Sequence, residues 1–478
     1  MKKWIALLLV AVMVLSFCAC GKESDAADTT AEANDPLKGK FSVGYGKTNI
    51  TPQEGVPLGS YGDEKTRISQ GILEYLYAIT VAITDAEGNT ILIITTDLSW
   101  GNERWVAVIR SAVRAKYGFA PEQVIVGGTH NHNAPAYNHN DERITRYMNM
   151  WQNEVMASVD QALEDRKPAE MYITNTETES LTFVRRYWLE NGFLKGDNWN
   201  DYVSSPLKKH ETDADETMRL VKFVREGGKD VMMVNWQSHA NYVGATLDVS
   251  ADYVGGLRDK VDKELDCLSV FYQGAAGNLN PWSRFDNENL SKNRKEHGEL
   301  VANYVIAAKD TFTKVETGKV ETYQYTFTGK VNHNDDKLVN QAKKIYNAYQ
   351  SGTSARECAN MGAAYGINNW RHASAIISRY NYGDTLDMEL NAFSIGDVAF
   401  VTLPVEFFDE TGRQIRADSP FEMTVIMGYT CGIGTYLPTA LGFKNKGYES
   451  FNCQFEAGTA ELCVTQYLTM LNDLHARK

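Results

Sequence analysis

The loop at residues 127–132 carries two histidines that are one residue apart. Its sequence is Gly-Gly-Thr-His-Asn-His, so His130 and His132 follow directly on the apolar segment 124–127. Two histidines at this spacing in a strand-end loop can place one imidazole on a metal ion and the other in the shell around it. The pair by itself is also compatible with a polar loop.

Two further residues of this kind follow other apolar segments. His239 comes soon after segment 231–236, and Glu406 comes soon after segment 399–403, in Leu-Pro-Val-Glu-Phe-Phe. An unpaired carboxylate among such apolar neighbours is costly, so we expect a cation or an arginine beside Glu406. The structural alternatives are a hydrogen-bonded histidine and an acid that favours a helix N-terminus.

Short apolar segments and amphipathic segments of helical length alternate along the chain. The predicted strands are residues 78–84, 91–96, 124–127, 218–224, 231–236, 268–272, 399–403 and 424–428. The predicted helices are residues 103–117, 142–164, 251–265, 294–311 and 458–474. This alternation predicts a layered α/β domain with mixed β-sheets flanked by helices, and with the metal site in loops that follow strands.

Composition and charge exclude some partners. The 478 residues are 43% hydrophobic and carry a formal net charge of −13, without a basic patch. This argues against nucleic acid or an anionic bilayer as the partner surface. After Cys20 the cysteines are Cys267, Cys358, Cys431, Cys453 and Cys463, which form no CxxC pair and allow at most two disulfides.

The N-terminus has the pattern of a bacterial lipoprotein signal. Two lysines precede an apolar run of 12 residues, and Cys20 follows a small residue, Ala19. We therefore expect a signal peptide at residues 1–19, a lipidated Cys20 at the start of a flexible acidic linker over residues 20–38, and a cell-membrane location outside the cytoplasm. Residues 39–478 show no linker or repeat, which predicts one large domain with no other membrane attachment.

Four ordered motifs resemble the catalytic N-terminal domain of the neutral/alkaline (non-lysosomal) ceramidases. They are spread over nearly the whole chain after the linker: residues 43–52 with 57–59, the loop 127–132 that is similar to the family's GTHTH, residues 273–281, and residues 434–439 followed by Tyr448-Glu449. Family members also carry a C-terminal immunoglobulin-like domain, for which we expect no room before Lys478.

The resemblance implies a set of site residues. Family members hold Zn²⁺ with two histidines, a glutamate and a tyrosine, which correspond by motif to His130, His239, Glu406 and Tyr436. Tyr448 matches a second active-site tyrosine. Arg185 matches a substrate-side arginine, although Val184 stands where the family has asparagine. His132 is placed in the shell around the metal.

The chemistry that the resemblance implies is hydrolysis of an amide, with a metal-activated water attacking the carbonyl carbon. Tyr448 and Arg185 are then expected to donate hydrogen bonds to the developing oxyanion, and His132 to pass a proton to the leaving amine. The expected substrate is a lipid amide such as an N-acylsphingosine, which would place the protein in sphingolipid metabolism.

One departure affects the expected substrate. Where the ceramidases carry a serine that is important for catalysis, this chain has Asn280. We expect this change to alter substrate positioning rather than to abolish hydrolysis, because a metal-activated water needs no side-chain nucleophile.

Two other functions stay open at this point. The first is a metallohydrolase on the same scaffold that acts on a non-sphingolipid amide or ester. The second is a lipoprotein that has lost catalysis and binds ligands in the cleft that corresponds to the active site of the family. An apolar tunnel to His130 favours the ceramidase reading, an open polar cleft favours the other hydrolase, and a missing ligand favours the binding protein.

Overall fold

The computed structural model describes residues 37–61, 67–137, 140–196, 205–333, 335–367 and 369–477. The predicted signal peptide, the lipidated Cys20 and most of the predicted linker lie outside these described residues.

A mixed sheet of nine strands runs through the described part of the chain, in the order β14-β12-β11-β6-β1-β3-β4-β5, with β16 paired to β6. The β12-β14 and β4-β5 pairs are parallel, and the others are antiparallel. The bounds are β1 Ser42–Asn49, β3 Tyr77–Thr84, β4 Thr90–Thr96, β5 Val124–Gly128, β6 Lys167–Glu177, β11 Thr217–Arg225, β12 Val231–Trp236, β14 Leu268–Gln273 and β16 Thr313–Val315.

A second sheet packs face to face against the first. Its order is β17-β18-β19-β21, with bounds Val320–Lys330, Thr385–Ile395, Val398–Leu403 and Met423–Gly428. One buried cluster joins the two sheets: Ile93 and Val270 of the large sheet lie in it with Phe393 and Val425 of the second. Burial of side chains from both sheets is the main force that holds them together.

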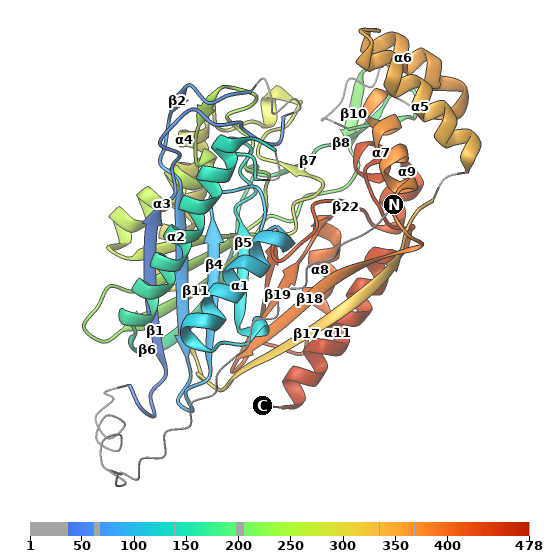
Figure 1. The fold of residues 1–478 in the computed structure, drawn as a ribbon. Coiled ribbons are helices and arrows are strands. Elements are labelled where there is room, and N and C mark those ends of the chain that lie inside the picture. Colours follow the sequence, from blue (N-terminus) through green and yellow to red (C-terminus); the bar gives the residue numbers. More distant parts are fainter. Residues whose placement is uncertain are drawn as a thin grey trace, which may run out of the picture.

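Helices cover the outer face of each sheet (Figure 1). Against the large sheet pack α1 (Glu103–Tyr117), α2 (Glu142–Glu164), α3 (Asp252–Leu265) and α4 (Arg294–Ala307). Against the second sheet pack α8 (Asp409–Ala417) and α11 (Thr459–Ala476). The result is four layers, helix-sheet-sheet-helix, so the predicted layered α/β fold with mixed sheets and flanking helices is confirmed.

Two glycines allow helix α2 to lie directly on strand β1. A Cβ atom on Gly44 would come within 1.9 Å of the Ala162 carbonyl oxygen, and one on Gly46 within 2.0 Å of the Ser158 carbonyl oxygen. No real side chain tolerates such approaches, so these positions require glycine. The Gly-Tyr-Gly of the first motif is therefore explained by packing.

A helical segment separates strands β17 and β18, and Figure 1 shows it at the end of the second sheet. It contains α5 (Asp336–Gln350), α6 (Ala355–Gly362) and α7 (Trp370–Tyr380). These helices share a small core of their own, with Val339, Ile345 and Ile376 among its buried residues. The segment was not predicted from the sequence.

Apart from four 3-10 helices of three residues each, the remaining short elements in the described ranges are three two-stranded sheets, one three-stranded sheet and two short α-helices. Their bounds are β2 Gly71–Ile72 with β13 Asp248–Val249, β7 Phe183–Val184 with β15 Leu279–Asn280, β20 Glu406–Phe407 with β22 Tyr436–Leu437, β8 Arg186–Leu189 between β9 Leu194–Gly196 and β10 Leu207–His210, α9 Ala440–Asn445 and α10 Tyr448–Phe451. Several of these carry the side chains of the site described below.

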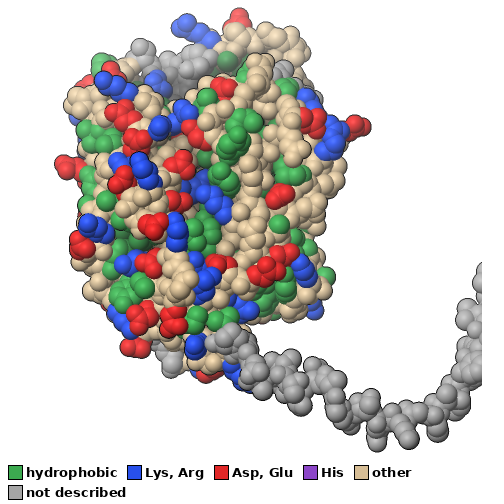
Figure 2. Space-filling view, turned by 90° about the vertical axis from the view of Figure 1, so that its left-hand side faces the viewer, with side chains coloured by type: hydrophobic (Ala, Val, Ile, Leu, Met, Phe, Trp, Pro, Cys, Tyr) green, Lys and Arg blue, Asp and Glu red, His purple; other side chains and the backbone are tan. Residues whose placement is uncertain are grey.

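On the face shown in Figure 2, acidic and basic side chains are interspersed with hydrophobic ones. Every helix in the described ranges is too short or too polar to span a lipid bilayer. The five described cysteines are all buried and none forms a disulfide.

Candidate metal centre and active site

A cavity of about 620 Å³ lies among the loops that follow strands β4, β5, β12, β19 and β21. Its volume suits a small-molecule ligand. The described residues that line it are aromatic, polar or charged apart from one glycine: Ser60, Tyr61, Trp100, His130, His132, Asn241, Arg371, Glu406, Gly434, Thr435, Tyr436, Tyr448, Asn452 and Gln454. The sequence-predicted residues His130, His132, Glu406, Tyr436 and Tyr448 thus share one cavity.

The backbone fixes the ring orientation of two predicted ligands. His130 Nδ1 lies 3.0 Å from the Ser99 carbonyl oxygen, and His239 Nδ1 lies 2.8 Å from the Ala276 carbonyl oxygen. A carbonyl oxygen only accepts hydrogen bonds, so both Nδ1 atoms carry the proton and each Nε2 presents a lone pair. This is the tautomer in which histidine binds a metal through Nε2.

The lone pairs of His130 and His239 face the same carboxylate oxygen. Glu406 Oε2 lies 3.4 Å from His130 Nε2 and 3.2 Å from His239 Nε2. Two ligands of one tetrahedral zinc ion, each about 2.0–2.1 Å from the metal, lie about 3.3 Å from each other. The spacing of these donor atoms therefore fits a shared metal ion.

The hydrogen bonding of the cluster points to the same conclusion. His239 Nε2 and Glu406 Oε2 are buried and have no hydrogen-bond partner. Burial, together with the charge of Arg185, lowers the pKa of His239 well below its ordinary value, so the imidazole is neutral. A buried carboxylate oxygen that faces two nitrogen lone pairs is unfavourable unless a cation lies between them, and the donor set suits a divalent metal.

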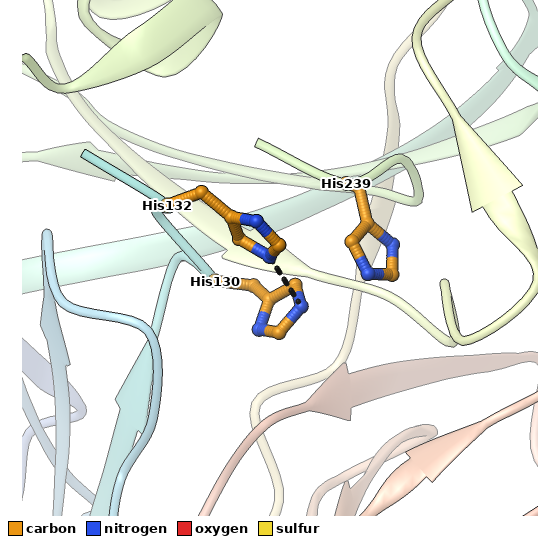
Figure 3. A group of neighbouring side chains, drawn as sticks. All are labelled: His130, His132 and His239. Atoms are coloured by element: carbon orange, nitrogen blue, oxygen red, sulfur yellow. Dashed lines mark hydrogen bonds between the residues drawn. The ribbon is translucent and has the colours of Figure 1, made fainter. Parts of the chain in front are cut away.

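His132 completes a group of three imidazoles (Figure 3). Its Nε2 lies 3.2 Å from His130 Nε2, and the possible ligand atoms of His130, His132 and His239 all lie within 4.8 Å of one another. The amide of His132 also donates to the Ala240 carbonyl at 3.0 Å, which joins the two histidine loops. His132 thus lies close enough to be a ligand itself or a neighbour of the metal.

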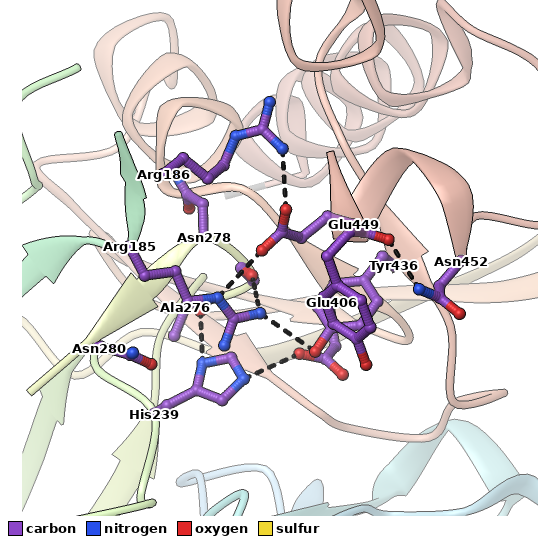
Figure 4. Close-up of polar contacts among 12 residues, drawn as sticks. Arg185, Arg186, His239, Ala276, Asn278, Asn280, Glu406, Tyr436, Glu449 and Asn452 are labelled. Atoms are coloured by element: carbon purple, nitrogen blue, oxygen red, sulfur yellow. Dashed lines mark hydrogen bonds and ion pairs between the residues drawn. The ribbon is translucent and has the colours of Figure 1, made fainter. Parts of the chain in front are cut away.

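Tyr436 and Glu406 are aligned by the short parallel strand pair β20-β22, in which they are direct partners. The Tyr436 hydroxyl accepts a hydrogen bond from Arg185 Nη2 at 3.1 Å (Figure 4). Burial, with the nearby Glu406 carboxylate, raises the pKa of Tyr436 well above its ordinary value. In this structure the hydroxyl is therefore neutral, and its hydrogen bond from Arg185 fixes its position.

Arg185 belongs to a fully buried ion-pair network. Its Nε lies 3.1 Å from Glu449 Oε1, while Arg186 Nη1 lies 2.8 Å from Glu449 Oε2. Although burial favours the neutral carboxyl, Arg186 and Arg185 keep the pKa of Glu449 below its ordinary value. Arg185 Nη2 also donates to the Gly277 carbonyl at 2.8 Å. These bonds orient Arg185 toward Tyr436.

Tyr448 and Asn280 occupy different positions relative to the cavity. Tyr448 lines it and meets Tyr436 edge to face, with ring centroids 5.3 Å apart. Asn280 is fully buried, and its Oδ1 accepts a hydrogen bond of 3.1 Å from Asn241, which does line the cavity. Asn280 thus contacts the cavity wall through a neighbour.

The segment 273–281 organises the site more widely than its motif indicated. Gln273 Nε2 donates to the Thr129 and Ser238 carbonyls at 3.1 and 2.6 Å, so one side chain connects the residues before His130 and His239. A Cβ on Gly277 would come within 2.5 Å of the Glu406 carbonyl oxygen, so only glycine permits this approach. These residues position ligands without being ligands.

Tyr429 is a site residue that the sequence reasoning missed. It directly follows β21, and its ring stacks on His130 with centroids 3.8 Å apart. Both residues have positive φ, 57° for Tyr429 and 60° for His130, a conformation that costs free energy for residues other than glycine. The sequence offered only one sign of this role, which is an aromatic residue directly after a predicted strand.

The comparison with protein families matches residues 41–264 to the model described as neutral/alkaline non-lysosomal ceramidase, N-terminal. The resemblance to the neutral/alkaline ceramidases is confirmed. Neutral ceramidase 1 of Arabidopsis thaliana is similar to this chain, with 23% identity over 211 residues. That match covers 41% of this chain and 25% of the ceramidase from Arabidopsis, so it spans about a quarter of that protein.

Two solved ceramidase structures share the fold. One is a ceramidase complexed with C2, with 17% identity and a TM-score of 0.68, covering 92% of this chain and 76% of the other. The second is the neutral ceramidase from Pseudomonas aeruginosa, with 18% identity, a TM-score of 0.68 and coverage of 92% and 75%. The ceramidase fold therefore extends well beyond residues 41–264.

Proposed function

We propose that the protein is a metal-dependent hydrolase of linear amide bonds, the reaction class of ceramidases. The observation that carries this proposal is the set of converging donor atoms. His239 Nε2 and Glu406 Oε2 lie unpartnered in a buried cluster, at ligand spacing and beside His130, next to a cavity of substrate size. The similarity to ceramidases supports amide hydrolysis as the reaction.

We assign His130, His239, Glu406 and Tyr436 as the residues that would hold a zinc ion, because imidazole, carboxylate and phenol oxygen suit that metal. A bound zinc ion would act as a Lewis acid and would make a water molecule more nucleophilic near neutral pH. Overall, the carbonyl carbon gains the water oxygen, the C–N bond breaks and the leaving nitrogen takes a proton.

The protein's own residues have distinct parts in this proposal. Tyr448 lines the cavity, and its hydroxyl can donate a hydrogen bond to the substrate carbonyl oxygen as negative charge develops there. Arg185 is fully buried and acts through Tyr436, which its guanidinium holds in place. Burial, with His130 nearby, lowers the pKa of His132 well below its ordinary value, so this imidazole is neutral. His132 lines the cavity, and this position would let it relay a proton to the leaving amine.

The metal assignment predicts that the purified protein contains one zinc ion per chain and that His239→Ala contains none. Removal of zinc with a chelator should abolish hydrolysis and lower the melting temperature, because a ligand at a thousand times its Kd stabilises the folded state by about 4 kcal/mol. Metal analysis, differential scanning calorimetry and an assay of amine release measure these effects.

His297→Ala is the matched control for loss of a buried histidine. His297 is buried, bonds Ser291 Oγ at 3.0 Å and lies outside the group formed by His130, His132 and His239, so this variant should keep its zinc. Absence of zinc from both the natural protein and His239→Ala would contradict the metal centre. Zinc binding without hydrolysis of any amide would instead favour a ligand-binding lipoprotein that has lost catalysis.

Asn280→Ser is expected to change amide hydrolysis by no more than about tenfold, since the hydrogen bond that Asn280 makes at the cavity wall is worth about 1 kcal/mol. The bond is the one that Asn280 accepts from Asn241. Initial rates on a fluorogenic N-acyl substrate measure the change. A gain of several orders of magnitude would show that a serine nucleophile had been restored and would overturn a mechanism in which water attacks.

The lining of the cavity favours, on one point, a metallohydrolase that acts on a non-sphingolipid amide or ester. Leucine, isoleucine, valine, methionine and phenylalanine are absent from its described lining, whereas a sphingolipid chain needs an apolar wall. A non-sphingolipid amide therefore stands beside an N-acylsphingosine as a candidate substrate of the same metal centre.

A further inference from the structure

One wall of the cavity is built by helix α7 and the segment 448–454. Arg371 comes from the first turn of α7, and Tyr448, Asn452 and Gln454 come from the segment. The two parts are locked together. The His372 ring stacks on Phe451 with centroids 4.0 Å apart, and Arg379 Nη1 donates to the Phe451 and Cys453 carbonyls at 2.6 and 3.0 Å. The helical segment between β17 and β18 is therefore part of the substrate site.

Arg371 brings a permanent positive charge into the cavity lining. The side chain of Asn369 accepts hydrogen bonds from the Arg371 and His372 amides, at 3.0 and 2.9 Å, and so fixes the start of the helix. The guanidinium lies over the Trp370 ring, 4.7 Å from its centroid. A guanidinium supported in this way is preorganised to bind a carboxylate through two parallel hydrogen bonds.

Two buried acceptors in the same lining require hydrogen-bond donors. Asn241 Oδ1 and Gln454 Oε1 have no hydrogen-bond partner, and Asn241 is only 8% exposed. A buried acceptor without a partner costs about 1–3 kcal/mol, which a hydroxyl or N–H group of a ligand would recover. An alkyl chain satisfies neither acceptor. It also gains nothing from a polar wall, whereas each buried methylene contributes about 0.8 kcal/mol in an apolar one.

We infer that the cavity takes a hydrophilic amide that carries hydroxyl groups and a carboxylate, with the carboxylate bound by Arg371. This inference rests on the proposed function, because it assigns the substrate class of the same site. It makes Arg371 a specificity-determining residue contributed by the α5–α7 segment.

The test measures binding and hydrolysis separately on the full, zinc-loaded protein. The probes are N-acetylmuramic acid, which has hydroxyl groups, one acetamide and one carboxylate, its uncharged carboxamide, and N-hexanoylethanolamine as a lipid-like amide. Isothermal titration calorimetry on the natural protein, Arg371→Gln and Arg371→Lys gives the affinities. We expect the acid to bind at least about tenfold more tightly than its carboxamide.

The variants identify the group that binds the carboxylate. The preference for the acid should fall below about twofold in Arg371→Gln and persist in part in Arg371→Lys, which keeps the charge but loses the planar fork. Equal affinity of acid and carboxamide for the natural protein, or tightest binding of N-hexanoylethanolamine, would overturn the inference. So would a preference that survives Arg371→Gln and disappears with the metal, because the carboxylate would then bind the metal.

Hydrolysis of the same probes separates this inference from the proposed function. Release of free amine is followed with fluorescamine. Tight, Arg371-dependent binding of the acid without any amine release would contradict amide hydrolysis and leave the ligand class supported. Amine release from N-hexanoylethanolamine alone would support the hydrolase and overturn the hydrophilic substrate. Melting temperatures of both Arg371 variants verify that they are folded.

Discussion

Glu406→Gln should lose the metal and reduce amide hydrolysis by more than about 100-fold, since even the outer partners of metal ligands are worth about 10–100-fold. Glutamine keeps the size of the side chain but removes the negative charge. The carboxylate oxygen that faces His130 and His239 would then be replaced by a neutral amide group, which binds zinc poorly. Metal analysis and kcat/KM on an N-acyl substrate measure the two effects.

Glu422→Gln is the matched control, because it makes the same chemical change at an exposed residue just before strand β21, whose far end leads to the site. This variant should keep both zinc and activity. If Glu406→Gln retained a full equivalent of zinc with natural activity, Glu406 would not be a ligand. In that case the three imidazoles of His130, His132 and His239 would be the remaining candidate ligand set.

The buried strands and the long amphipathic helices were predictable because their patterns are strong. Segments such as 231–236 are strongly apolar, and the structure places β12 at Val231–Trp236, as predicted. Helices α1 and α2 also have their predicted bounds, and Asn102 and Asp141 cap their N-termini. The residues of an apolar segment or a capped amphipathic repeat largely determine their own secondary structure, so contacts with the rest of the fold change it little.

The elements that were missed depend on contacts distant in sequence. Strand β17 reads VETYQYTFTGK and has few fully buried residues, so it has little apolar signal, yet it pairs with β18 along its full length. Strand β1 contains Gly44 and Gly46, which weaken any strand prediction and make sense only once α2 lies on them. Helices α5–α7 bury only a small core of their own.

The site was predictable where a motif marked it and otherwise not. His130, His239, Glu406 and Tyr436 come from four separate segments of the chain, and only the family resemblance related them before the fold was known. Glu449 is part of the fourth motif, but no role for it was apparent from the sequence. Its role depends on ion pairs with Arg185 and Arg186, which lie more than 250 positions away in the sequence. Arg371 carried no sequence signal, since a lone arginine at the start of a helix is ordinary.

The largest expected effect on stability comes from Glu449→Gln, which should lower the free energy of unfolding by about 3–5 kcal/mol, because removing one member of a buried ion pair leaves an uncompensated charge. Arg185, Arg186 and Glu449 are all fully buried at their contacts, so water cannot replace the lost carboxylate. Arg186 would keep its ion pair with Glu211, and Arg185 would keep the Gly277 carbonyl and the Tyr436 hydroxyl.

Glu170→Gln is the matched control for this prediction, because Glu170 and Lys314 form an ion pair whose side chains are 51% and 53% exposed. An exposed pair contributes at most about 1 kcal/mol, so this variant should unfold close to the urea midpoint of the natural protein. Urea unfolding followed by tryptophan fluorescence compares the three proteins. Similar midpoints for Glu449→Gln and Glu170→Gln would mean that the buried network contributes no more than a surface pair. The position of Tyr436 would then depend mainly on other contacts, such as the pairing of β20 with β22.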